Sequence, residues 1–300
     1  MRASKRDFLT LLDFSAEELD AIVSRAIALK NGGDERTLIG RTGVLLFEMK
    51  STRTRVAFDA GMAQLGGHMV VLSPEDSQIG RGEPVEDTAR VLSEMVDVIV
   101  IRTLEQKTIE ALAAAATIPV INAMSSSYHP CQLLADVQTY QELRGPIADA
   151  TVAFVGDGYN MCHSYINAAR QRGFSLKIAC PPGYQPDPQL LKSTNNVQLV
   201  ETPREAVHKA DLVVTDVWSS MGHEDEASER HATFSGYQIN AGLLKHANDD
   251  VLLMHCLPAH RGEEVSAEML DDPRSVVWQE AGNRLHSQKA LLEFVINGGW

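Results

Sequence analysis

The sequence has few cysteines, and none of them are spaced for a zinc site or a disulfide framework. Its 300 residues include four cysteines, Cys131, Cys162, Cys180 and Cys256, which lie far apart and form no CxxC pair. Structural zinc sites and small disulfide scaffolds both need closely spaced ligands or half-cystines. We therefore expect reduced thiols, which are typical of a cytoplasmic protein. We also expect no bound metal and no cofactor.

Long apolar runs and an excess of basic residues are missing too. The N-terminal stretch MRASKRDFLTLLDF contains no apolar core of signal-peptide length, and no other run is long enough for a transmembrane helix. Basic residues number 27 against 40 acidic ones, which gives a net charge of −13. Because such a chain is repelled by polyanions, we expect neither a nucleic acid nor a membrane as partner. Any anion must be held by a local group of donors.

What the sequence does contain is a regular alternation of short apolar segments with helical ones. The first helix is predicted after Ser15, which forms a capping box with Glu18. Strands are predicted at 42–47, 68–72, 96–102, 118–123, 150–158, 175–181, 197–201, 211–218, 250–258 and 275–280, and later helices at 54–66, 84–95, 105–116, 130–145 and 286–296. Continuous apolar strands that alternate with helices indicate parallel sheets covered on both faces.

The fold class follows from this alternation and from the chain length. We predict an α/β protein with two doubly wound parallel-sheet domains of similar size and the active site in the cleft between them. The first domain would comprise residues 1–145 and the second 146–285, with a C-terminal helix, 286–300, packed back on the first. Residues 219–236 are predicted to form a long irregular loop.

Polar clusters follow several of the predicted strands, and ligands of open α/β sheets bind at these carboxyl ends. In the first cluster, STRTR (51–55), Ser51 suits a helix N-cap, and a helix N-terminus binds anions. Arg53 adds a planar fork that can hold two phosphate oxygens. The alternative is a capped helix with solvated arginines.

A second cluster, YHPCQ (128–132), stands at the start of a long predicted helix. His129 and Gln132 can both donate to a carbonyl oxygen placed there, and Arg102, at the end of a strand, can join them. The simpler alternative for His129 is a satisfied structural histidine. Cys131 is expected to serve packing.

In the third cluster, HCLPAHRG (255–262), His255 and Cys256 suggest a metal pair or a thiol nucleophile. No further metal ligands stand at suitable spacing, and neighbouring residues on a strand point to opposite faces, which disfavours a catalytic dyad. The Leu257–Pro258 bond is a candidate cis peptide.

Two more clusters belong to the second predicted domain. VGDGYNMCHS (155–164) resembles a dinucleotide-binding loop, but Met161 occupies the third glycine position and the next strand lacks a terminal acid. TDVWSSMG (215–222) places Asp216 at a strand end, where it can bind an ammonium group, with Ser220 as a donor. A mobile lid and a plain surface loop both remain possible for the segment that follows.

Together these motifs resemble the aspartate/ornithine carbamoyltransferase family, and within it the ornithine branch. The matching stretches, in family order from about residue 7 to 296, are FEMKSTRTRVAFDAGMAQLGGH, SQIGRGEPVEDTARVLS, IRT, YHPCQLLAD, VGDGYNMCHS, TDVWSSMG, HCLPAHRG and AGNRLH. The resemblance implies transfer of a carbamoyl group from carbamoyl phosphate to the δ-amine of L-ornithine. It also implies a homotrimer or a multiple of trimers.

The resemblance assigns a role to each motif. It implies that carbamoyl phosphate is bound by Ser51, Thr52, Arg53, Thr54 and, from a neighbouring subunit, Gln78. The carbamoyl end would be bound by Arg102, His129, Gln132 and Arg284. These four residues and Cys256 would be the catalytic residues. Ornithine would be bound by Asn160, Asp216, Ser220, Met221, Cys256 and the Leu257 carbonyl. Arg55 is expected to be structural.

Some positions depart from the family pattern. RTLEQK (102–107) lacks a histidine that is frequent there, and AMSSS (123–127) replaces a usual leucine and aspartate. Tyr159 stands where asparagine is common, and AGN (281–283) replaces AEN. These departures concern affinity and supporting contacts. Putrescine or N-acetylornithine carbamoyltransferases remain as alternatives, as does a catalytically silent binding protein of the same family.

Overall fold

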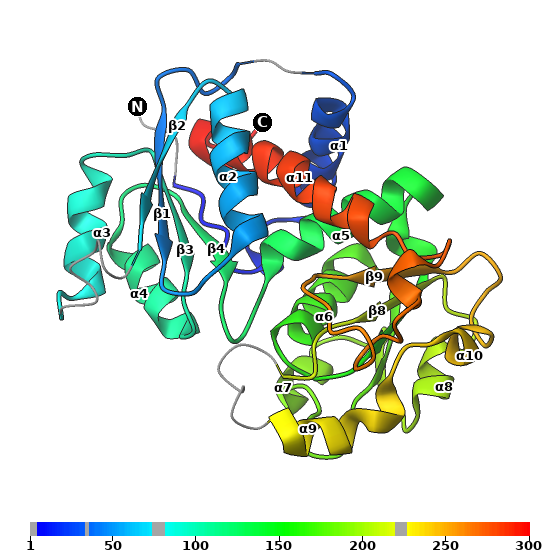
Figure 1. Cartoon of the computed structure of the whole chain (residues 1–300). Coiled ribbons are helices and arrows are strands. Elements are labelled where there is room, and N and C mark those ends of the chain that lie inside the picture. Colours follow the sequence, from blue (N-terminus) through cyan, green and yellow to red (C-terminus); the bar gives the residue numbers. More distant parts are fainter. Residues whose placement is uncertain (1–4, 34–35, 74–81, 220–226) are drawn as a thin grey trace. The chain divides into compact units, whose positions relative to one another are not determined.

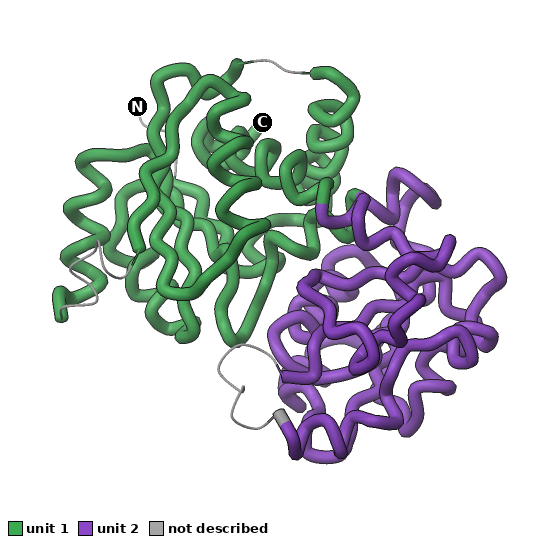
Figure 2. Tube along the Cα trace, viewed as in Figure 1, with its two compact units in different colours: residues 1–138, 282–300 green, residues 139–281 purple. Residues whose placement is uncertain are grey.

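The computed structural model describes residues 5–33, 36–73, 82–219 and 227–300. The chain divides into two compact units, residues 1–138 with 282–300 and residues 139–281 (Figure 2). Two helices, α5 (Pro130–Arg144) and α11 (Val277–Asn297), contribute residues to both units.

Unit 1 is built on a parallel sheet with the strand order β2-β1-β3-β4 (Figure 1). Its strands are β1 (Thr42–Phe47), β2 (His68–Leu72), β3 (Val98–Arg102) and β4 (Val120–Met124), and its helices include α1 (Ala16–Lys30), α2 (Thr52–Gln64), α3 (Val85–Ser93) and α4 (Gln106–Ala115). Alternate residues of β1 and β3, such as Val44 and Ile99, pack with Ile109 and Leu112 of α4. The period-two alternation of strand side chains thus gives each face of the sheet its own apolar layer.

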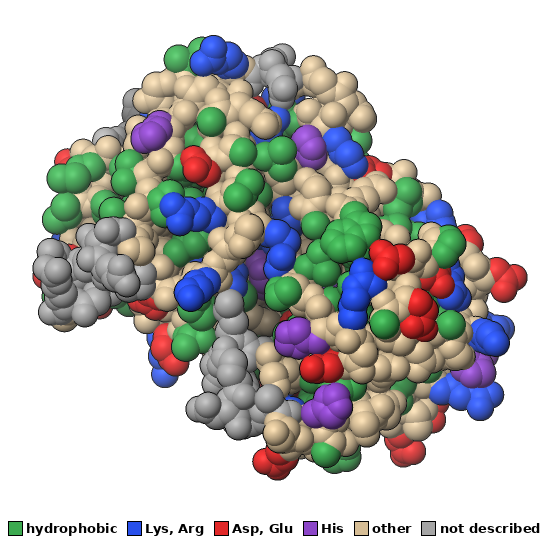
Figure 3. Space-filling model, viewed as in Figure 1, with side chains coloured by type: hydrophobic (Ala, Val, Ile, Leu, Met, Phe, Trp, Pro, Cys, Tyr) green, Lys and Arg blue, Asp and Glu red, His purple; other side chains and the backbone are tan. Residues whose placement is uncertain are grey.

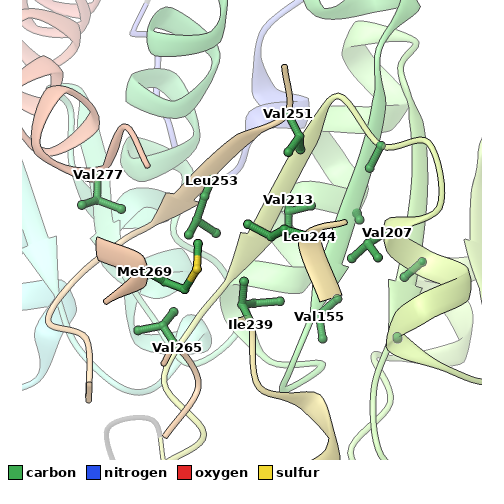
Figure 4. Close-up of a cluster of buried hydrophobic side chains, with 14 of the residues drawn as sticks. Val155, Val207, Val213, Ile239, Leu244, Val251, Leu253, Val265, Met269 and Val277 are labelled. Carbon is green, nitrogen blue, oxygen red and sulfur yellow. The ribbon is translucent and has the colours of Figure 1, made fainter. Parts of the chain in front are cut away.

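Unit 2 has a five-stranded parallel sheet with the order β7-β6-β5-β8-β9. The strands are β5 (Thr151–Val155), β6 (Ser175–Ala179), β7 (Val197–Leu199), β8 (Leu212–Thr215) and β9 (Leu252–His255), and the helices include α6 (Asn160–Arg172), α7 (Pro188–Leu191), α8 (Pro203–Val207), α9 (Ala227–Phe234) and α10 (Ala241–Leu244). Figure 4 shows Val213 and Leu253 from adjacent strands meeting Ile239, Leu244 and Met269 in one buried cluster. Burial of this apolar surface is the main favourable term in folding the unit.

The predicted α/β class with two parallel-sheet domains is confirmed, and each predicted strand from 42–47 to 250–258 is present, although most are shorter than predicted. The capping box of Ser15 and Glu18 is also present at the start of α1.

Two local predictions were wrong. Within residues 275–280, Ser275 forms an isolated parallel bridge with Leu253, but the strand ends there because helix α11 begins at Val277 instead of residue 286. Val277 is buried whereas Trp278 is exposed, so the apolar run VVW suits one face of a helix. Residues 219–236 are not irregular throughout, since 227–234 form helix α9, whose Phe234 is buried.

The surface agrees with the mixed charges of the sequence. On the face shown in Figure 3, acidic and basic side chains are interspersed over unit 2. Within the described part of the chain, no helix combines the length and the apolar character needed to cross a bilayer.

Candidate active site

Several of the predicted site residues follow the strands at which each sheet reverses its order. In unit 1 the chain passes from β1 to β2 and then returns to the other side of β1 with β3. Ser51–Thr54 follow β1, and Arg102 is the last residue of β3. In unit 2 the same reversal separates β5 from β8, which are followed by Asn160 and Asp216. Ligands of doubly wound sheets bind at this switch point, so each unit offers a binding position of its own.

In unit 1 the first of these segments is the N-terminus of helix α2. Ser51 is its N-cap, and its Oγ accepts a hydrogen bond from the Thr54 N–H at 3.3 Å. The predicted cap is therefore confirmed. No acidic side chain stands in the first turn of this 13-residue helix, so nothing there offsets the positive end of its dipole. Backbone N–H groups and the dipole together favour an anion at this helix start.

Arg284 connects three segments of unit 1 that are distant in the sequence. Its Nη1 donates to Gln132 Oε1 at 2.6 Å and its Nη2 donates to Thr54 Oγ1 at 3.1 Å. The Gln132 Nε2 in turn donates to Asp136 Oδ1 at 2.8 Å. These hydrogen bonds orient the Gln132 amide and hold Arg284, which is only 2% exposed, beside the start of α2. Asp136, one helical turn beyond Gln132 in α5, is a supporting residue that the sequence did not single out.

His129 lies among three guanidinium groups. Burial lowers its pKa well below the usual 6.5, and the positive charges of Arg284, Arg102 and Arg53 lower the pKa further. The imidazole is therefore neutral at pH 7 and carries one N–H donor. A chain with a net charge of −13 thus gathers three arginines around one neutral histidine. Such a cluster suits a small, strongly charged anion.

The pKa of His129 has a consequence for stability that can be measured. Because folding prevents this imidazole from taking up a proton, acidification below pH 6.5 favours the unfolded chain by up to about 1.4 kcal/mol per pH unit. We expect the free energy of unfolding, measured with urea, to fall less steeply between pH 7 and pH 5.5 in His129→Gln than in the wild type. His208→Gln, a change at an exposed histidine, should leave the wild-type slope. Equal slopes in all three proteins would show that His129 titrates normally.

Two segments that depart from the family pattern contact each other. Ser125 Oγ donates to Gln106 Oε1 at 2.6 Å, and the same Oγ accepts the N–H groups of Ser127 and Tyr128. Gln106 Oε1 also accepts a hydrogen bond from Asn122 Nδ2. A serine and a glutamine thus order the turn that leads into His129. A hydrogen-bonded turn of this kind fixes the position of the side chain that follows it.

In unit 2 the buried carboxylate of Asp216 is the main charged group of the predicted amino-acid site. Asp216 Oδ1 accepts the Val217 N–H at 2.8 Å and the thiol of Cys256 at 3.0 Å. The side chain is 7% exposed, and burial raises the pKa of its carboxyl above the usual 3.8 despite these hydrogen bonds. A buried carboxylate is stabilised by a cation, so the site suits an ammonium group.

The neighbouring His255 has a structural role. Its Nδ1 accepts the Leu257 N–H at 2.9 Å, so its Nε2 carries the proton and donates to Glu264 Oε1 at 3.0 Å. Cys256 instead contacts Asp216. The side chains of His255 and Cys256 thus have different partners, as predicted for neighbouring residues at a strand end. The Leu257–Pro258 peptide bond is cis, as predicted, and Leu257 has a φ of 55°.

The glycines of VGDGYNMCHS serve the tight turn between β5 and α6. Gly156 has a φ of 139°, and a Cβ on Gly158 would lie 2.3 Å from the Pro186 nitrogen. The turn places Asn160, 5% exposed, as the first residue of α6. Close packing of backbone therefore accounts for both glycines.

Three predicted ligands, Gln78, Ser220 and Met221, lie outside the described residues. Two groups of side chains in the described parts of the chain have ligand atoms close enough to hold a metal ion: Asp216, His255 and Cys256, and His260, Glu263 and Glu264. Both ring nitrogens of His255 already have hydrogen-bond partners within the protein.

The two units correspond to two family models. Residues 6–142 match the carbamoyl-P binding domain of aspartate/ornithine carbamoyltransferases, and residues 148–295 match the Asp/Orn binding domain. The chain belongs to the aspartate/ornithine carbamoyltransferase family. The resemblance predicted from the motifs is confirmed, and with it the assignment of the chain to the carbamoyltransferases.

Individual carbamoyltransferases are similar over the whole length. An ornithine carbamoyltransferase of Chromohalobacter salexigens is 55% identical over 299 residues, 98% of each chain. An anabolic ornithine carbamoyltransferase of Pseudomonas aeruginosa is 54% identical over 298 residues, also 98% of each chain. The solved structure of an ornithine carbamoyltransferase from Pyrococcus furiosus superposes with a TM-score of 0.93 at 46% identity, covering 98% of each chain.

Proposed function

We propose that this chain transfers the carbamoyl group of carbamoyl phosphate to the δ-amine of L-ornithine, giving L-citrulline and phosphate. The observation that carries the proposal is the hydrogen bonding of buried Arg284 to Thr54 at the start of α2 and to Gln132. The charges of Arg284, Arg102 and Arg53 also act on His129 and lower its pKa. These residues belong to the unit that matches a carbamoyl-phosphate-binding domain. The names of the relatives, which are ornithine carbamoyltransferases, support the choice of amine.

In this proposal unit 1 binds carbamoyl phosphate. Ser51, Thr52, Arg53 and Thr54 hold the phosphate at the start of α2, where N–H groups and the dipole favour a dianion. The carbamoyl end is held by Arg102, His129, Gln132 and Arg284. When the amine nitrogen attacks the carbonyl carbon, negative charge builds on the carbonyl oxygen. Preorganised donors such as the Arg102 guanidinium and the neutral His129 N–H stabilise that charge.

Unit 2 binds the amino acid. Asp216 pairs with the α-ammonium group, Asn160 holds the head group, and Ser220 and Met221 complete its contacts. Cys256 and the carbonyl of Leu257 orient the δ-amine. As the new C–N bond forms, the C–O bond to phosphate breaks and the leaving phosphate accepts the amine proton. A pH–rate profile of the bound complex that follows a protein group would contradict this last role.

The same assignment includes assembly and location. The chain acts as a homotrimer or a multiple of trimers, in which Gln78 reaches the site of a neighbouring subunit. Exposed apolar side chains on unit 1, among them Val91 and Met95, support association of copies. The free cysteines support a reducing, cytoplasmic location. Light scattering on the purified protein tests the assembly, and a monomer would contradict it.

A direct assay separates the proposed reaction from its alternatives. We expect citrulline from carbamoyl phosphate and ornithine, with kcat/KM at least about 10²-fold higher than for putrescine, N-acetylornithine or aspartate. Asp216 suits a free α-ammonium group, which N-acetylornithine lacks because its α-nitrogen is acylated. Putrescine keeps that amine but lacks the α-carboxylate of the head group, and aspartate lacks the δ-amine. Preference for one of these amines would move the chain to the corresponding alternative. No product with any amine, together with retained binding of carbamoyl phosphate, would indicate the silent binding protein.

A further inference from the structure

Arg230 of helix α9 is a buried cation that belongs to none of the predicted ligand sets. It is 5% exposed, and its Nη1 donates to Asp157 Oδ2 at 2.6 Å and to the Trp218 carbonyl oxygen at 2.8 Å. Its guanidinium carbon lies 4.8 Å from the centre of the Tyr184 ring. Asp157 is buried as well, with 7% of its side chain exposed. Burying two charges costs desolvation free energy, even when they form an ion pair with additional hydrogen bonds. The place of such a pair in the fold therefore indicates what it does.

The partners of Arg230 lie on the two segments that carry the predicted amino-acid ligands. Asp157 belongs to the turn after β5, three residues before Asn160, and Trp218 follows β8, two residues after Asp216. The third partner, Tyr184, supports the first turn directly, because its carbonyl accepts the Gly158 N–H at 2.8 Å. Strands β5 and β8 are the neighbours at the switch point of this sheet. Arg230 therefore joins the two segments that flank that point.

We propose that Arg230, paired with Asp157, is a positioning residue for the amino-acid substrate. It sets the spacing between Asn160 and Asp216 through the turns that bear them, and it contacts no substrate itself. The inference rests on the proposed function, since it concerns the amino-acid site of the same reaction. Small displacements of binding groups weaken affinity strongly, so the bridge governs how well the amino acid is held.

Helix α9 has other contacts that keep it in place when the bridge is removed. The Phe234 ring, 0% exposed, stacks on Trp218 at 6.0 Å and meets the Tyr184 ring edge-on at 4.9 Å. His231 also contacts Trp218. An apolar replacement for Arg230 of similar length is therefore compatible with a folded unit 2. Methionine, being unbranched and adaptable, is suited to this position.

The test compares Arg230→Met, Arg230→Lys and the double variant Asp157→Asn/Arg230→Met in steady-state kinetics. For Arg230→Met we expect the KM for ornithine to rise at least about tenfold, while the KM for carbamoyl phosphate stays within about twofold. Lysine should restore part of the affinity, because its ammonium group can still pair with Asp157. The double variant buries no unpaired charge, but it still lacks the hydrogen bond to Trp218. Its KM for ornithine should therefore stay raised.

A matched control is available in the same unit. Arg274 likewise forms an ion pair, with both of its side-chain hydrogen bonds to Asp272 measuring 2.8 Å, but it lies beside β9, the edge strand of the sheet. Arg274→Met should leave both KM values unchanged. If Arg230→Met lowers only kcat or the melting temperature, with both KM values unchanged, the residue is merely structural and the inference is overturned. The double variant supplies the same comparison if Arg230→Met alone does not fold. An unmodified protein that makes no citrulline would contradict the proposed function instead.

Discussion

Replacement of Arg53 by alanine is expected to lower kcat/KM for carbamoyl phosphate by about 10³-fold. The change removes a charge-assisted fork at the N-terminus of α2 and one of the three positive charges around His129. Because the proposed function assigns the lost interactions to the phosphate, the KM for carbamoyl phosphate should rise more than the KM for ornithine. Product-inhibition studies give an independent measurement, since inhibition by inorganic phosphate should weaken in parallel.

The chain offers a matched control two residues further along the same helix. Arg55 is exposed, and its replacement by alanine should change kcat/KM by no more than about threefold. A similar loss in both variants would indicate a general effect of positive charge at this helix start. A wild-type KM for carbamoyl phosphate in Arg53→Ala would show that the phosphate binds elsewhere.

Replacement of Asp216 by asparagine should raise the KM for ornithine by about 10²- to 10³-fold and leave the KM for carbamoyl phosphate within about twofold. The amide keeps the shape of the carboxylate but loses the negative charge that we propose pairs with the α-ammonium group. In the wild type, the KM for ornithine should also rise as the pH falls through the raised pKa of Asp216. This acid limb should be absent in the asparagine variant.

Asp216→Asn should weaken the binding of ornithine but raise the free energy of unfolding. Because burial raises the pKa of Asp216, the folded protein carries an unfavourable charge at every pH above that value. Asp216→Asn should therefore unfold at a higher urea concentration than the wild type at pH 7, and the difference should shrink as the pH falls.

Asp211→Asn is the control at the other end of β8, where the carboxylate accepts hydrogen bonds from Thr151 and Asn248. Asp211→Asn should lower the free energy of unfolding and leave the KM values for ornithine and carbamoyl phosphate unchanged. A destabilised Asp216→Asn would contradict the sign of the pKa shift.

The sheets could be predicted from the sequence because buried parallel strands are nearly continuous apolar runs. This signal located β1 and β2 to the residue. It failed at 275–280, where the run VVW has strand propensity but continues without a break into a long helix. Short apolar runs do not by themselves distinguish a strand from the buried face of a helix. Tertiary packing of Val277 decided the outcome.

The charged residues of the candidate site could be predicted from the sequence, whereas the residues that hydrogen-bond to them could not. Arg102 is the last residue of β3 and Asp216 directly follows β8, and a charged residue at the end of an apolar run is visible in the sequence. The bond between Arg284 and Thr54 joins residues 230 positions apart, and no local pattern indicates it. The contact of Ser125 with Gln106 is similar, because each residue departs from the family pattern and their pairing appears only in three dimensions.

The bridge from Arg284 to Thr54 and Gln132 also bears on how the protein is made. Unit 2 is one continuous stretch, 139–281, whereas unit 1 joins residues 1–138 to residues 282–300. Arg284 follows the whole of unit 2 in the chain, so its hydrogen bonds to Thr54 and Gln132 can form only after every residue of unit 2 has been synthesised. Contacts between residues so far apart in the sequence are slow to form, because a long loop must close first. Unit 2 can therefore fold as a unit while unit 1 still awaits its second segment.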